Sequence, residues 1–387
     1  MRSANDLSRL PLAQALLLPP EDAAISQAKQ NGHHSPRQTI EKWSDYAGGY
    51  SVSIARNLEE ARHRLLQALD IVDREPVLLP ANATHPLVEV VKQSGAIPIF
   101  GELNQDLQLS SHQHVRIVWS QPLPGILIKD GIVAEHTVLD YSDSVPLPAL
   151  ETGESSFQAD VTIFDLHLSP DPKTAGALLV FNSEALYARF IADSRPAEPT
   201  LYARAASQLK RLPAIVSRQV TALDMVSTGL QVAAGLPAPS VFDGIALAHG
   251  VAVQIPDEGS PSTFWTYASS ENTPVQWLPQ LRPVHYAAIA SHLTTARHLE
   301  RWLMVPVSPD NDAEANKQTV LGIVKAAEYM GLRWRTDPAQ AAHYAALLNA
   351  RYGSDHDAYR PAFSIEAKLP TETMFCAEDV VGPACRV

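Results

Sequence analysis

The chain has 387 residues, of which 45% are hydrophobic and 19% are charged, and its formal net charge is -12. This length and composition are typical of a globular protein with a large core and two domains. The excess of acidic residues argues against a surface that binds nucleic acid or an anionic membrane. No apolar run reaches the roughly 18 residues that a membrane-spanning helix needs, and we expect no signal peptide.

The two cysteines, Cys376 and Cys385, both lie near the C-terminal end of the sequence. A disulfide between them would close a small loop and organise no domain, so this usage fits a reducing compartment. We therefore expect a cytoplasmic protein with neither a nucleic-acid nor a membrane partner.

The predicted elements begin with a helical arm over residues 1–45, broken in the segment KQNGHHSPRQ. Residues 57–69 predict a helix, because Asn57 can cap it and acidic side chains fill its first turn. Apolar residues recur there at helical spacing and mark one buried face: Leu58, Ala61, Leu65 and Leu69. Residues 85–95 predict a second helix, which Gly95 ends.

Short apolar segments alternate with these helices and predict strands. They are PVLLP (76–80), AIPIF (96–100), VRIVWS (115–120), HTVLDYS (136–142), VTIFDLHL (161–168) and GALLVFN (176–182). Strands that are apolar throughout and alternate with helices indicate a mostly parallel sheet covered by helices on both faces. We therefore predict a large α/β domain over residues 46–200.

Beyond this domain the pattern is mixed. Residues 183–195, 201–236, 292–302 and 310–331 are helical in pattern, whereas 250–256, 262–269 and 303–309 are strand-like. The mixture predicts a smaller α+β domain over residues 201–335, followed by a C-terminal extension over residues 336–387.

Six segments resemble, in the same order, segments of the DegT/StrS-type sugar aminotransferases. They are residues 75–104, 136–144, 161–190, 207–219, 275–286 and 300–327. The resemblance implies the type I fold of pyridoxal phosphate (PLP)-dependent transferases, in the aspartate aminotransferase-like superfamily. It also implies PLP as the cofactor and a homodimer, because active sites of the family lie between subunits.

The resemblance assigns cofactor-binding roles to four residues. Asp140 would face the pyridinium nitrogen and keep it protonated. Asp143 stands where the family has a glutamine that touches the ring oxygen, and a carboxylate would repel that oxygen. His85, beside Thr84, is the candidate for stacking on the ring. Asp165 falls where the family has a hydroxyl that binds the phosphate.

The Schiff-base lysine of the family follows a histidine by three residues, which makes His167 the reference point here. The third residue after His167 is Pro170, and proline cannot form an imine. Lys173 is the candidate catalytic lysine if PLP is used, but its loop would have to fold back by roughly 10 Å, at about 3.3 Å of reach per residue.

The phosphate cup also departs from the family pattern. Its small hydroxyl residues align with Leu58, Glu59, Glu60 and Ala61. Acidic side chains suit the positive end of a helix dipole but repel a phosphate dianion. A shift of the alignment by one turn would instead bring Ser51 and Ser53 into the cup.

Three functions stay open from the sequence. The first is a homologue that has lost its cofactor chemistry and acts as a binding or scaffold protein for a small-molecule or protein partner. The second is an active PLP-dependent aminotransferase that uses Lys173. The third is an enzyme without PLP, in which Asp140, Asp143, Asp165 and His167 hold a cation or do acid–base work.

The paired histidines His33 with His34 and His112 with His114 lack a cysteine or carboxylate partner at telling spacing. We therefore predict no metal site from them.

Overall fold

A computed structural model of the chain describes residues 35–104, 109–110, 115–122, 134–142, 144–146, 159–168, 172–192, 198–234, 246–248, 250–256, 258–273, 275–277, 301–308, 311 and 313–331. The chain divides into two compact units, residues 1–348 and 349–387, and every described residue belongs to the first.

The largest feature is an eight-stranded sheet with the order β1-β9-β8-β6-β5-β2-β3-β4. Its strands are β1 (Ser51–Ala55), β2 (Pro76–Pro80), β3 (Ile97–Leu103), β4 (Leu109–Ser110), β5 (Ile117–Ser120), β6 (His136–Asp140), β8 (Val161–Asp165) and β9 (Ala177–Phe181). Strands β3, β2, β5, β6 and β8 are parallel. Strand β9 is antiparallel to both of its neighbours, and β4 is antiparallel to β3. The prediction of a mostly parallel sheet is confirmed.

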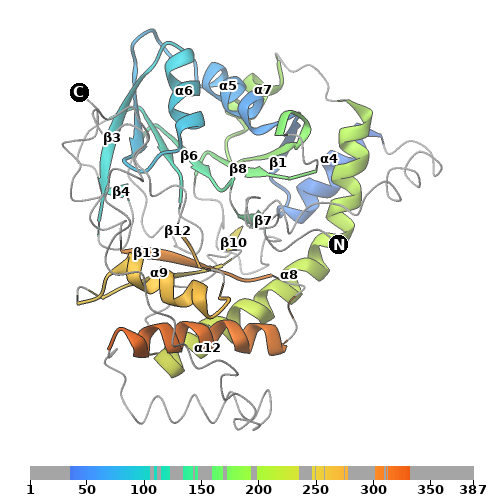
Figure 1. The fold of residues 1–387 in the computed structure, drawn as a ribbon. Helices are drawn as coiled ribbons and strands as arrows, with labels where there is room; N and C mark the ends of the chain where they lie inside the picture. The colour runs from blue at the N-terminus through green and yellow to red at the C-terminus, as the bar shows by residue number, and fades with distance from the viewer. Residues whose placement is uncertain are drawn as a thin grey trace. The chain divides into compact units, whose positions relative to one another are not determined.

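Helices α5 (Leu58–Ala68), α6 (His85–Gln93) and α7 (Glu184–Ala192) pack on one face of this sheet (Figure 1). Their apolar residues share one core with strand residues such as Leu79, Trp119 and Ile163. Alternate strand residues belong to a second core, which includes Phe164 together with residues of α4 (Pro36–Tyr46) and α8 (Pro199–Ala234). Both faces of the sheet are therefore buried, which explains why its strands are apolar throughout.

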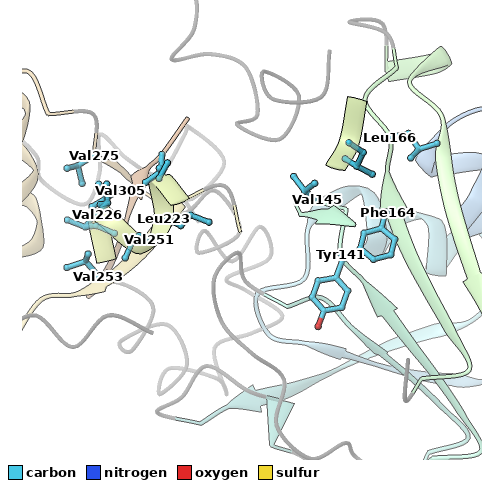
Figure 2. Close-up of a cluster of buried hydrophobic side chains, with 14 of the residues drawn as sticks. Tyr141, Val145, Phe164, Leu166, Leu223, Val226, Val251, Val253, Val275 and Val305 are labelled. Atoms are coloured by element: carbon cyan, nitrogen blue, oxygen red, sulfur yellow. The ribbon is translucent and has the colours of Figure 1, made fainter. Parts of the chain in front are cut away.

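A three-stranded antiparallel sheet follows, with the order β11-β13-β12. Its strands are β11 (Gly250–Gln254), β12 (Gln276–Trp277) and β13 (Trp302–Pro306), and its helices are α9 (Pro261–Ser270) and α12 (Ala313–Tyr329). A separate two-stranded pair joins β7 (Val145–Pro146) to β10 (Ala246–Leu247). Figure 2 shows members of the second core, among them Phe164 of β8, Val251 and Val253 of β11 and Val305 of β13.

The local predictions from the sequence were largely confirmed. Helix α5 begins after Asn57, whose Oδ1 accepts a hydrogen bond from the Glu60 main chain at 2.8 Å. Residues 201–236 were predicted to be helical, and α8 (Pro199–Ala234) covers this segment up to residue 234, with Pro213 inside the helix. No helix within the described ranges is both long enough and apolar enough to cross a membrane.

Two local predictions were wrong. Residues 262–269 are not a strand but part of α9, because Ser260 caps the helix, Pro261 starts it, and Phe264 and Ala268 share its buried face. Those signals outweigh the aromatic and β-branched residues that favour a strand. The predicted break at KQNGHHSPRQ ends earlier than expected, because Ser35 caps α4 and Pro36 starts it.

Helix α12 packs closely through Gly322 against the residues that follow α9, Glu271 and Thr273. A Cβ atom at residue 322 would overlap with Oγ1 of Thr273. We predict that Gly322→Ala lowers the free energy of unfolding by about 1–3 kcal/mol, because the buried contact has no room for a methyl group. Urea denaturation measures the change, and Glu328→Ala, at an exposed position of α12, should stay within about 0.5 kcal/mol of wild type. Equal stability of the two variants would contradict the close packing.

Candidate functional site

The carboxyl ends of β5, β6 and β8 meet the beginning of α5, and buried polar residues gather there. Ligands bind at this edge of open parallel sheets because loops and helix N-termini converge on it. Asp140 is the last residue of β6 and is 1% exposed. It is therefore the natural starting point for the site.

Asp140 is surrounded by donors. Its Oδ2 accepts from Nε of Arg62 at 2.8 Å and lies 2.7 Å from Nη2 of the same side chain. Oδ2 also accepts from Nε1 of Trp119 at 3.3 Å, and Oδ1 accepts from the Ser142 main chain at 3.2 Å. The Arg62 guanidinium further donates from Nη2 to Oγ of Ser142 at 3.3 Å.

Arg62 is a site residue that our sequence analysis missed. It lies four residues after Leu58 and three before Leu65, so the helical period places it on the apolar face of α5. The Arg62 side chain is 4% exposed, and the Asp140 side chain is 0% exposed. The sequence did carry a signal for Arg62, namely a charged residue among the apolar positions of one helix face. Charged side chains are rarely buried unless they are paired, so this position predicts a buried partner.

These contacts test whether the residues present fit a PLP ring. A carboxylate offers about four lone-pair positions, and four N–H groups already point at Asp140, from Arg62 (two), Trp119 and Ser142. Three of these donors meet Oδ2 and one meets Oδ1, so Oδ2 has no acceptor position left for a ring nitrogen. The Arg62 guanidinium would therefore compete with a ring nitrogen for this carboxylate.

Asp165, which is partly buried, and His167, which is buried, form a second pair near this one. The Asp165 Oδ1 accepts from the His167 main chain at 2.8 Å and lies 3.3 Å from the His167 Nδ1. His167 has a φ of 48°, which is the left-handed region that a non-glycine residue rarely adopts. The turn that Asp165 makes with the main chain of His167 holds this conformation.

Burial shifts both titrations. It raises the pKa of Asp165 to about 6, although the hydrogen bond from the His167 main chain and the Arg62 charge act in the opposite direction. Burial lowers the pKa of His167 to about 4, against a smaller opposing contribution from the Ser142 main chain. At neutral pH the histidine is therefore uncharged, and its Nε2 finds no hydrogen-bond partner among the described residues.

Lys173 lies in a short 3-10 helix, η1 (Pro172–Thr174), between β8 and β9, and is exposed. The Lys173 carbonyl accepts from Nδ2 of Asn57 at 2.9 Å, and the Gly176 N–H donates to the Arg56 carbonyl at 2.9 Å. The loop from residue 172 to 176 therefore rests on the beginning of α5, where the first turn carries Glu59 and Glu60.

The remaining predicted residues have other surroundings. His85 is the first residue of α6, and its half-exposed side chain has Nδ1 3.8 Å from Oε1 of Glu89. Ser51 donates through Oγ to Glu184 at 2.7 Å, whereas Ser53 lies within β1. Asp143, Pro170 and the four histidines of the predicted pairs, His33, His34, His112 and His114, lie outside the described residues.

No protein-family model matches the chain, and no curated protein matches it. Solved structures do match. The aminotransferase TlmJ from Streptoalloteichus hindustanus is 16% identical, with a TM-score of 0.63 over 82% of this chain and 99% of its own. PseC from Helicobacter pylori, an aminotransferase involved in the biosynthesis of pseudoaminic acid, is 12% identical, with a TM-score of 0.63 over 81% and 99%.

A third match is GDP-4-keto-6-deoxymannose-3-dehydratase with a trapped PLP-glutamate geminal diamine. It is 12% identical, with a TM-score of 0.62 over 80% of this chain and 99% of its own. At these identities the likeness concerns the fold. The chain therefore has the type I fold of PLP-dependent transferases, as the resemblance of its six ordered segments implied.

The contact between Asn57 and the lysine loop can be tested by substitution. We predict that Asn57→Ala lowers the free energy of unfolding by about 1–2 kcal/mol, because it removes the helix cap and the bond to the Lys173 carbonyl. Asn57→Asp keeps the cap but not the Nδ2 donor, so it should lie between Asn57→Ala and wild type in urea denaturation. If Asn57→Asp is as stable as wild type, the loop contact contributes nothing.

Asp165 and His167 should give opposite pH dependences of stability. The folded pKa of Asp165 is raised from 3.8 to about 6, so its contribution to stability is lost as the pH rises through that range. The folded pKa of His167 is lowered from 6.5 to about 4, so its contribution grows as the pH rises from there to 6.5.

We therefore predict that the stabilities of two single variants diverge with pH. Asp165→Asn keeps the histidine and gains stability between about pH 4 and 6.5 relative to His167→Asn, which keeps the aspartate. Urea denaturation of both variants at several pH values across this window measures the difference in their free energies of unfolding. The other carboxylates contribute equally to the pH dependence of both variants. Parallel pH profiles would show that neither titration is shifted as described.

Proposed function

We propose that the chain is a DegT/StrS-like homologue of the sugar aminotransferases that has lost its Schiff-base lysine and its phosphate cup. In this proposal it acts as a non-catalytic or repurposed binding protein, in the cytoplasm and as a homodimer. The fold supports the relationship, and the six ordered segments in the sequence support the family.

The observation that carries the proposal is the position of the loop between β8 and β9. The main chain of residues 172–176 is bonded to Arg56 and Asn57, so it lies beside the helix N-terminus that a phosphate would approach. The exposed carboxylate of Glu59 adds negative charge at the same place. Both the anchoring of the aldehyde and the binding of the phosphate are therefore disfavoured at this end of the site.

The opposite end of the site supports the same conclusion. The Oδ2 atom of Asp140 is engaged by Arg62 and Trp119, so a protonated ring nitrogen that approaches this oxygen would have to displace one of these donors. A buried ion pair resists this, because separating it leaves an uncompensated charge in the interior.

The alternative is an active aminotransferase that uses Lys173 as a relocated anchor. Its support is that Lys173 is exposed and belongs to the loop beside the beginning of α5. An amine on a long, flexible side chain reaches several ångströms from its main chain. The two functions differ in whether this amine forms a covalent bond with PLP.

The test is to incubate the wild-type protein with PLP, reduce it with borohydride and measure the intact mass. We predict no stoichiometric adduct in wild type, and the same low labelling in Lys173→Ala and in Lys92→Ala, whose amine is also exposed. A stoichiometric adduct that Lys173→Ala abolishes and Lys92→Ala keeps would contradict the proposal and establish the alternative.

A further inference from the structure

We infer that Asp140 forms a buried cation site whose occupant is the chain's own Arg62, and that shortening Arg62 opens this site to small planar cations of the guanidinium or amidinium class. This goes beyond the proposed function, because it concerns what the Asp140 carboxylate binds rather than whether PLP reacts. The inference depends on three features of the structure, namely the support of the carboxylate, the shape of its occupant and the burial of both.

The carboxylate has support that does not depend on Arg62. Asp140 belongs to β6, which pairs with β5 and with β8, so its main chain is fixed from both sides. The Trp119 indole, which is fully buried, donates to Oδ2, and the Ser142 main chain donates to Oδ1. These two donors hold the carboxylate in place when the arginine side chain is removed.

The occupant matches the carboxylate through its shape as well as its charge. Nε and Nη2 of Arg62 lie 2.8 and 2.7 Å from the same Oδ2, and Nη2 also reaches Oγ of Ser142. A planar guanidinium presents several donors in a rigid fork, whereas an ammonium is a compact and strongly hydrated charge. The contacts are therefore those of a site for a planar cation.

Burial makes the space that Arg62→Ala would leave beside Asp140 selective for a cation. Arg62 is 3% exposed and Asp140 is 1% exposed, so truncation at Cβ leaves a space next to a carboxylate in a close-packed interior. An uncompensated buried charge strongly favours any partner that neutralises it and satisfies its lone pairs. A small cation that binds only the folded state then raises the melting temperature as its concentration increases.

The experiment measures the melting temperature of Arg62→Ala with and without methylguanidinium. We expect the substitution to lower Tm by about 5 °C or more. Methylguanidinium should restore at least half of this loss, with a half-maximal effect at about 1–10 mM. Methylammonium at the same ionic strength should restore little, because it lacks the planar fork.

Two control variants locate the effect. Arg64→Ala removes an arginine of the same helix whose ion-pair partner, Glu60, is 27% exposed, so methylguanidinium should not restore its stability. Asp140→Asn combined with Arg62→Ala removes the carboxylate, and rescue should disappear. Equal rescue in either control, or no rescue of a folded Arg62→Ala, would overturn the inference.

The wild-type protein provides a second measurement in case Arg62→Ala does not fold. The Arg62 Nε–H should give a slowly exchanging NMR signal, because it is buried and bonded to Asp140. The signal is assigned to Arg62 if it is absent from the spectrum of Arg62→Lys, which has no Nε–H group. A signal that exchanges as fast as those of exposed arginines, or that disappears when PLP is added at saturating concentration, would show that Arg62 is not the resident occupant.

Discussion

The buried ion pair between Arg62 and Asp140 is the interaction on which the rest of the site depends. It joins α5 to the carboxyl end of β6 across 78 residues of sequence, with the Trp119 indole from β5 on the same carboxylate oxygen. Such a pair gains little stability over an apolar contact of the same shape, but it is costly to break. The charges therefore restrict how α5 can sit at this edge of the sheet.

The other parts of the site agree with this constraint. Residues 172–176 contact the beginning of α5, where Asn57 donates to the Lys173 carbonyl. Asp165 and His167 at the end of β8 form a pair that is largely uncharged between about pH 4 and 6, because burial raises the pKa of Asp165 to about 6 and lowers the pKa of His167 to about 4. In the function that we propose, a transferase fold is thus combined with a site whose carboxylate is bound by the protein's own arginine.

The features that the sequence predicted well are local ones. The cap at Asn57, the acidic first turn of α5 and the apolar strands depend on neighbours within a few residues, and their positions were confirmed. The partner of Asp140 was not predicted, because the contact between Arg62 and Asp140 exists only after the sheet has formed. Residues 262–269 were wrongly assigned to a strand, since the packing of Phe264 and Ala268 outweighed their local preference. The left-handed turn at His167 likewise depends on the side chain of Asp165 and left no pattern in the sequence.

The central claim is that Arg62, rather than a bound cofactor, satisfies the Asp140 carboxylate. The most direct measurement is a crystal structure of the wild-type protein grown with a saturating concentration of PLP. Our account predicts the Arg62 guanidinium on Asp140, at the distances of an ion pair, with no ring between them. Density for a pyridine ring whose nitrogen contacts Asp140, with the Arg62 side chain turned away, would contradict it.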